Sequence, residues 1–199
     1  MEPVRVITST ALPLRRSDVD TDQIIPAEWL KRVERTGFGE GLFAAWRKDP
    51  TFALNSNDYR DAQILVAGPN FGTGSSREHA VWALQDYGFR AVISPRFADI
   101  FRNNCTKVGL VPVQVDAAVG EALLAAVEAD PTVEITVDVE TRKVWAEAAG
   151  IEGDFPLDDF TQMRLLEGLD DIGLTLRHAD AITAFEADRP AWLPTTSGV

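Results

Sequence analysis

The sequence contains very little cysteine and histidine. Among its 199 residues there is one cysteine, Cys105, and there are two histidines, His79 and His178. A single cysteine excludes a disulfide framework within the chain and is typical of a reducing cytoplasm. An iron–sulfur cluster is held by several thiolates, which one cysteine cannot supply. Any metal chemistry in which this chain takes part would therefore have to be hosted by another chain.

Basic residues are also scarce. Nineteen Lys and Arg stand against 31 Asp and Glu, which gives a formal net charge of -12. Nothing resembling a basic stripe offsets this charge, which argues against a nucleic-acid partner. The chain also lacks an apolar run long enough to span a membrane and an apolar signal core at its start. We therefore expect a soluble cytoplasmic protein with no nucleic-acid and no membrane partner.

The remaining composition is that of an ordinary folded domain. Hydrophobic residues make up 45% of the chain, and its length suffices for a sizeable core. We expect a single domain over residues 1–199, with a frayed tail over 190–199. A small anionic substrate would need a local island of positive charge on this acidic chain.

Regular patterns begin at residue 63. Short apolar runs predict buried strands at 64–67, 91–94 and 110–113. Amphipathic spacing predicts helices between and after them, at 76–87 with Gly88 as C-cap, at 96–104 and at 119–127. This alternation predicts an α/β fold, with a parallel or mixed sheet flanked by helices.

The two ends of the chain are less regular. Residues 1–62 are expected to be irregular, with a short apolar piece at 11–14, a mobile glycine-rich loop at 36–41 and a short helix at 42–46. Alternating residues at 133–139, together with 143–145, predict a hairpin. Three short helices are expected to follow, at about 158–167, 170–177 and 180–188, with Asp158, Asp170 and Asp180 as N-caps.

The segment most informative about chemistry covers residues 70–80, between a predicted strand and a predicted helix. Glycines such as Gly72 and Gly74 let a backbone approach a ligand closely, and a helix N-terminus favours an anion. Arg77, expected in the first helical turn, opposes the helix dipole unless an anion compensates it. Its planar guanidinium can grip a carboxylate with two hydrogen bonds.

Simpler interpretations of this segment exist. Ser75 with Glu78 three residues later is also a capping box, which requires no catalytic role. A phosphate- or nucleotide-binding α/β domain is a second possibility. Against it, Gly72 and Gly74 lack a third glycine at the dinucleotide-binding offset, and the Gly-Lys-Ser/Thr of a P-loop is missing.

Two motifs carry a family resemblance. Gly-Thr-Gly-Ser-Ser-Arg-Glu-His-Ala at residues 72–80 resembles the hallmark of the aconitase superfamily's swivelling domain, and Asp-Thr-Asp-Gln-Ile-Ile-Pro-Ala at 20–27 resembles its second hallmark. Over about residues 12–190 the chain is similar to small subunits of bacterial 3-isopropylmalate dehydratase, notably at 30–38, 98–104 and 168–176. The resemblance implies an aconitase-like swivelling domain of β/β/α type.

The resemblance also implies an activity. Such a subunit takes part in leucine biosynthesis as half of a hydro-lyase that isomerises 2-isopropylmalate and 3-isopropylmalate through isopropylmaleate. The reaction needs a Lewis acid on the departing hydroxyl, a base for a carbon-bound proton, and cations for two carboxylates. In this superfamily the Lewis acid is a [4Fe–4S] cluster on the large subunit. The implied partners are that large subunit and a small dicarboxylate substrate, and no cofactor is expected in this chain.

Carried over by position, the resemblance implies roles for single residues. Ser75 matches the serine that acts as base, as an alkoxide, and Asp22 matches an active-site acid. Ser76 and Gly74 match substrate contacts, and Arg77 matches the arginine that binds substrate and steadies the alkoxide. Substrates are sorted by the loop after the Asp-Thr-Asp motif, which implies a specificity role for Leu30, Lys31, Arg32 and Val33.

Other residues and functions stay open. We expect His79 to be structural, His178 to stand at a helix end and Cys105 to be a buried or half-buried thiol rather than a ligand. Two other functions are compatible with the same resemblance. One is a small subunit of homoaconitase or a related hydro-lyase, and the other is a non-catalytic swivelling domain that binds a carboxylate.

Overall fold

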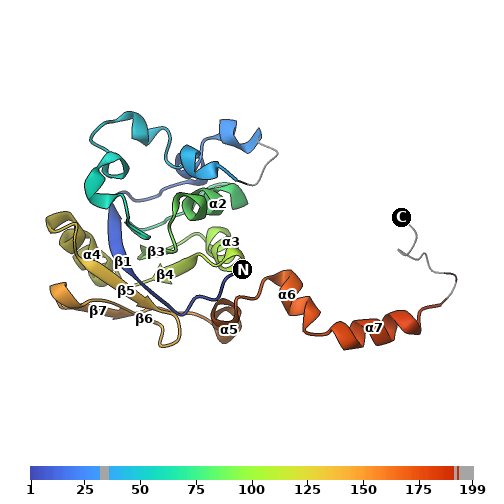
Figure 1. Cartoon of the computed structure of the whole chain (residues 1–199). Helices are drawn as coiled ribbons and strands as arrows, with labels where there is room; N and C mark the ends of the chain where they lie inside the picture. Colours follow the sequence, from blue (N-terminus) through green and yellow to red (C-terminus); the bar gives the residue numbers. More distant parts are fainter. Residues whose placement is uncertain (32–35, 191, 193–199) are drawn as a thin grey trace.

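The structure, a computed structural model, describes residues 1–31, 36–190 and 192. These residues form a seven-stranded sheet in the order β4-β3-β2-β1-β5-β6-β7 (Figure 1). The strands are β1 (Val6–Leu14), β2 (Ile64–Ala67), β3 (Ala91–Ser94), β4 (Val111–Gln114), β5 (Glu134–Asp138), β6 (Lys143–Ala146) and β7 (Ile151–Asp154). Strands β1 to β4 run parallel, whereas β5, β6 and β7 pair antiparallel. The predicted α/β class with a mixed sheet is confirmed, as are its strands near 64–67, 91–94 and 110–113 and the hairpin.

The central strand, β1, corrects the expectation that residues 1–62 are irregular. β1 pairs with β2 on one side and with β5 on the other. Its inward positions include the small residues Ser9 and Ala11, so the strand lacks the strong apolar alternation that marks a strand in the sequence. The edge strand β7 was also not expected, because it is short and only half buried.

Helices cover both faces of the sheet. On one face lie α2 (Glu78–Tyr87) and α3 (Asp99–Val108), and on the other lies α4 (Ala117–Ala129). Successive strand residues alternate between these two cores, so that Leu65 packs with α2 and Ile64 with α4. All three predicted helices are confirmed, although α3 begins and ends a few residues later than expected.

The connection from β1 to β2 is more ordered than its composition indicates. Its described residues form α1 (Thr21–Ile24) and five 3₁₀ helices, η1 (Ala27–Lys31), η2 (Phe38–Gly41), η3 (Trp46–Lys48), η4 (Ala53–Asn55) and η5 (Asn57–Tyr59). The mobile loop expected at 36–41 is wrong for residues 38–41, which are largely buried. A Cβ on Gly39 would lie 2.8 Å from the Tyr87 backbone nitrogen, so this glycine permits close packing on α2. The short helix expected at 42–46 is instead a turn over residues 42–45, and Trp46 begins η3.

The C-terminal helices form an arm. α5 (Asp159–Glu167) packs on the body through buried Leu165, whereas α6 (Asp171–Leu176) and α7 (Ala179–Ala187) project away from it (Figure 1). Asp158 and Asp170 accept hydrogen bonds from the backbone N–H of Thr161 and Gly173, so their predicted capping is confirmed. The prediction for Asp180 is wrong, because α7 has its N-cap at His178. Most of the tail expected to be frayed, 191 and 193–199, lies outside the described residues.

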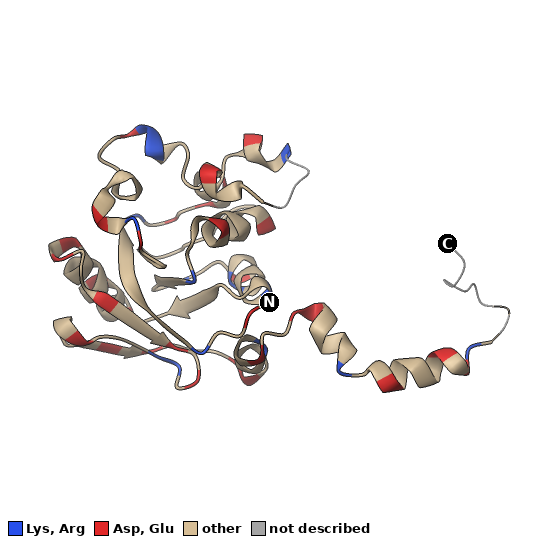
Figure 2. Cartoon of the chain, viewed as in Figure 1, with Lys and Arg blue, Asp and Glu red and all other residues tan. Residues whose placement is uncertain are grey.

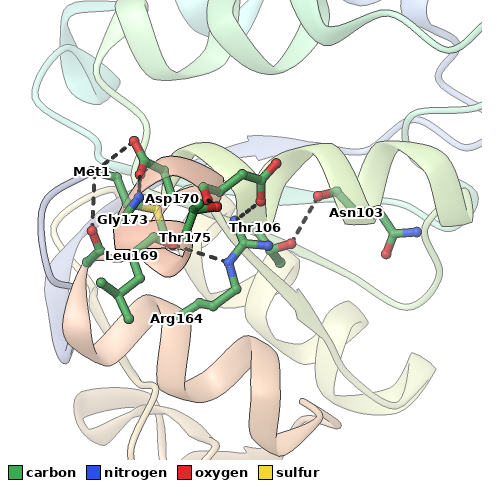
Figure 3. A network of polar contacts seen from close by, with 10 residues as sticks. Met1, Asn103, Thr106, Arg164, Leu169, Asp170, Gly173 and Thr175 are labelled. Atoms are coloured by element: carbon green, nitrogen blue, oxygen red, sulfur yellow. Dashed lines mark hydrogen bonds and ion pairs between the residues drawn. The ribbon is translucent and has the colours of Figure 1, made fainter. Parts of the chain in front are cut away.

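The root of the arm is fixed by polar contacts. Arg164 donates to the Leu169 carbonyl at 3.2 Å (Figure 3). It also donates to the Asp171 carboxylate at 2.9 Å. The amino group of Met1 donates to the Gly168 carbonyl at 3.3 Å and lies 4.0 Å from the Asp170 carboxylate. The start of the chain therefore helps to anchor the start of the arm.

Candidate functional site

The two motifs picked out in the sequence meet at one edge of the sheet. β1 and β2 are parallel neighbours, so the segments that follow them leave the same edge. The backbone N–H groups of Gly72 and Thr73 donate to the Val19 carbonyl at 2.8 and 3.1 Å, and Asp20 forms a parallel bridge with Thr73. Segments that are some 50 residues apart are thereby joined side by side.

Two glycines shape the second segment. Gly72 has φ +78°, and a Cβ there would lie 2.2 Å from the ring of Phe101 on α3. Gly74 has φ +88°, also in the region that residues with a Cβ rarely adopt. Gly72 thus lets the segment pack against α3, and Gly74 lets it turn before the two serines.

Ser75 and Ser76 lie exposed just ahead of α2. The helix starts at Glu78, and its N-cap, Arg77, has extended backbone angles and makes no capping bond through its side chain. The placement of Arg77 in the first helical turn and the Ser75–Glu78 capping box are therefore wrong. Within the described part of the chain, the Ser75 hydroxyl has no hydrogen-bond partner, so no structural bond occupies it.

Arg77 and Asp22 form an ion pair across the two segments. A guanidinium N–H of Arg77 donates to Oδ1 of Asp22, which lies in the first turn of α1. The Arg77 side chain is 19% exposed and that of Asp22 is 55% exposed. A guanidinium has five N–H donors, so this contact leaves others for a ligand while it fixes the direction of the side chain.

Arg77, Ser75 and Ser76 line a pocket of about 220 Å³, whose lining does not include Asp22. Its walls are Gly72 and residues 74–77 on one side, and Thr21 with residues 98–101 on the other. Thr21 and residues 98–101 belong to the segments 20–27 and 98–104 that carry the resemblance, but none of them was predicted as a site residue. The resemblance was the signal that could have pointed to them. A larger open hollow of about 620 Å³ near Arg102 and Arg142 is lined by none of the predicted catalytic or substrate-binding residues.

The expected specificity residues are placed only in part. Leu30 is half-buried and Lys31 exposed at the end of η1, and neither lines the pocket. Arg32 and Val33 lie outside the described residues.

The described residues do not fit a metal cluster. Over residues 1–31 and 36–190, no three His, Cys, Asp or Glu side chains come together as a metal site. Cys105 is fully buried, and burial raises the pKa of its thiol well above the usual value, which disfavours the thiolate that a metal requires. Its prediction as a buried thiol is confirmed. No helix among the described residues is long and apolar enough to cross a membrane.

The histidines have structural surroundings. The ring of His79 lies 4.7 Å from the ring of Trp82 and 5.3 Å, edge-on, from the ring of Phe38. It therefore packs between α2 and η2, consistent with its expected structural role. His178 stands between α6 and α7, at a helix end as expected.

Comparison with known proteins agrees with this geometry. Residues 1–118 match the family model of the aconitase C-terminal domain, which is the class that the sheet and the paired motifs define. Residues 171–199 match the model of the C-terminal domain of the 3-isopropylmalate dehydratase small subunit.

Related proteins match the sequence along almost the whole chain. The 3-isopropylmalate dehydratase small subunit of Frankia casuarinae is 68% identical over 197 residues, covering 99% of this chain and 100% of the relative. That of Acidothermus cellulolyticus is 66% identical over 196 residues, 98% of each chain. The crystal structure of 3-isopropylmalate dehydratase from Methanocaldococcus jannaschii superposes with a TM-score of 0.65 at 26% identity, covering 91% of this chain and 99% of that one. The chain belongs to the family of 3-isopropylmalate dehydratase small subunits, which confirms the resemblance.

Proposed function

We propose that this chain is the small subunit of a 3-isopropylmalate dehydratase that interconverts 2-isopropylmalate and 3-isopropylmalate in leucine biosynthesis. One observation carries the proposal: Ser75 and Arg77 line one pocket and Asp22 pairs with Arg77. The relatives of the chain share its full length. In the reaction a hydroxyl and a proton leave neighbouring carbons as water, giving isopropylmaleate. Water then returns with the two positions exchanged.

Ser75 is the proposed base. As an alkoxide, its Oγ takes the proton from the substrate carbon and later returns it. A serine hydroxyl is too weak an acid to ionise alone, so the alkoxide requires nearby cations and N–H donors in a dry site. Arg77 and the N-terminus of α2 are the groups of this chain that can supply them. Because Ser75 is exposed here, the site becomes dry only when a partner covers it.

The neighbouring residues hold the substrate. Arg77 binds a substrate carboxylate through N–H groups not used by Asp22, and the Ser76 hydroxyl and the Gly74 backbone contact the same diacid. Asp22 acts by holding the guanidinium in place. Leu30, Lys31, Arg32 and Val33 are proposed to sort substrates by the group on the remaining carbon.

We assign no residue of this chain to bind the departing hydroxyl. The described residues offer no ligand set for a cluster, in keeping with a [4Fe–4S] cluster on the large subunit that would supply the Lewis acid. The active enzyme is therefore proposed to need both subunits.

The exposed apolar side chains of the arm are evidence for a large-subunit partner. Ile172, Leu176 and Phe185 are 69%, 62% and 74% exposed on helices too short to be stable alone in water. Acidic residues accompany them on both helices (Figure 2). With a net charge of -12, a second copy would meet like charge, so a larger chain with an apolar, basic-rimmed groove fits the arm better.

Reconstitution tests the proposal. The chain is co-expressed with its large subunit, the cluster is reconstituted anaerobically and isopropylmaleate absorbance is followed. We expect turnover with the native chain and none with Ser75→Ala, because the base is lost, while co-purification of the two subunits is unchanged. Ser56→Ala, which changes the serine that caps η5, is the matched control and keeps native turnover.

The alternatives predict other results. Native rates with Ser75→Ala would remove Ser75 from the mechanism. A preference for a tricarboxylate over isopropylmalate would favour the homoaconitase function, since a site built for a third carboxylate rejects an isopropyl group. Tight binding of isopropylmalate by the isolated chain, with no activity beside any large subunit, would favour a non-catalytic domain.

A further inference from the structure

Thr21 makes two hydrogen bonds to the backbone around the proposed base. Its N–H donates to the Thr73 carbonyl at 2.9 Å, and its hydroxyl donates to the Ser75 carbonyl at 3.1 Å. The residue is 2% exposed, so little water competes for the second bond. One residue thus holds the two carbonyls that flank Gly74.

Gly74 lies between the two carbonyls that Thr21 binds, and its backbone is the part of the segment that needs a restraint. A glycine at φ +88° has wide conformational freedom, and a Cβ there would make only ordinary contacts, the shortest 3.4 Å. Local sterics therefore do not fix the segment at this point. Neither does the Ser75 side chain, whose hydroxyl has no partner among the described residues. The hydrogen bonds from Thr21 supply the missing restraint.

We propose that Thr21 is a positioning residue for Ser75: its hydroxyl clamps the Ser75 carbonyl and so fixes where the Ser75 Oγ points in the pocket. The inference rests on the proposed function, in which that oxygen moves the proton. Thr21 itself contacts no reacting atom. Its effect on rate comes from holding the base in reacting geometry, where displacements near 1 Å change rates by about 100-fold.

The first test measures motion at position 75 without any activity. Ser75→Cys places an exposed thiol there, and native Cys105 is fully buried, so a nitroxide label attaches at position 75. In the isolated full-length chain we expect Thr21→Val, which keeps the shape and loses the hydroxyl, to sharpen the label's spectrum through faster motion. Thr21→Ser keeps the hydroxyl and should leave the spectrum close to that of the parent.

A matched control separates positioning from general loosening. Ser9 is a buried residue of β1, and its hydroxyl accepts a hydrogen bond from the Gln63 N–H at 3.1 Å. Ser9→Ala removes a buried hydroxyl of the same kind outside the pocket. It should lower thermal stability without mobilising the label. Mobilisation by Ser9→Ala, or equally by Thr21→Ser and Thr21→Val, would overturn the inference.

The second test uses the reconstituted two-subunit enzyme with Ser75 in place. We expect Thr21→Val to lower kcat by about 10- to 100-fold with KM within about twofold, and Thr21→Ser to recover most of kcat. An unchanged kcat in Thr21→Val would overturn the positioning role and leave the proposed function standing. Failure of the proposed function shows separately, as native turnover in Ser75→Ala.

Discussion

Gly72 is the residue at which the site segment depends most on the lack of a side chain. Its φ of +78° disfavours any residue with a Cβ, and that Cβ would lie 2.2 Å from the Phe101 ring. We predict that Gly72→Ala costs about 1–2 kcal/mol for the left-handed backbone and a further ~1–3 kcal/mol for overpacking. Urea unfolding of the isolated chain measures both together.

Gly150→Ala separates the two costs. Gly150 has φ +66° with nothing within 4 Å of a Cβ, so only the backbone cost applies there. Equal losses of unfolding free energy in the two variants would show that Phe101 yields without cost, against the close packing described.

At the same scale, the sequence indicated the segments of the candidate site but not its internal contacts. The order of strand, glycine-rich segment and helix predicted Ser75 and Arg77 near a helix start, although both precede α2 instead of lying at its first turn. The capping box failed because α2 begins at Glu78, beyond the reach of Ser75. The Arg77–Asp22 pair and the Thr21 clamp could not be predicted, because they depend on β1 lying beside β2.

Among the elements, the arm differs most from the rest of the fold. We predict that the double variant Leu176→Asp, Phe185→Asp keeps the melting temperature of the isolated chain, because both side chains are exposed there. Each substitution should weaken binding to the large subunit by at least about tenfold, since burying a Leu or Phe contributes about 1.5–3 kcal/mol. Titration calorimetry against the purified large subunit measures this.

A surface change on the body is the control. Val6→Asp alters an apolar side chain that is 52% exposed on β1, and it should leave the affinity as it is. An unchanged affinity in the double arm variant would show that the large subunit does not cover the arm. Concentration-dependent self-association of the native chain, abolished by that variant, would point to a second copy instead.

Prediction of the elements succeeded where the apolar pattern was strong. The strands β2, β3 and β4 consist almost wholly of buried residues, and their runs are plain in the sequence. β1 was not predicted because its inward positions include the small residues Ser9 and Ala11, which weaken the apolar alternation. Its place is also set by two neighbours distant in sequence. Likewise, the glycines of η2 indicated mobility, whereas Gly39 permits close packing on α2 and Gly41 permits close packing against the Trp29 ring of η1.

For the whole molecule, Cys105 is a reporter of global unfolding. The thiol is buried in the core between the sheet and α3, and burial raises its pKa above the usual 9.0. We predict that iodoacetamide at pH 8 leaves the native chain unmodified and alkylates one thiol per chain in urea, because only the thiolate reacts. Mass spectrometry counts the adducts. The exposed thiol of Ser75→Cys should react in the native state as the positive control, and native labelling of Cys105 at the unfolded rate would contradict its burial.

The position of β1 also governs the order in which the molecule can be made. β1 is synthesised before both of its neighbours in the sheet, which begin at Ile64 and Glu134. Until the second neighbour emerges, one side of β1 keeps unpaired amide and carbonyl groups, the condition under which nascent chains aggregate. Residues 15–133 must be synthesised before that side can close, so the growing chain has a long interval in which chaperones can bind it.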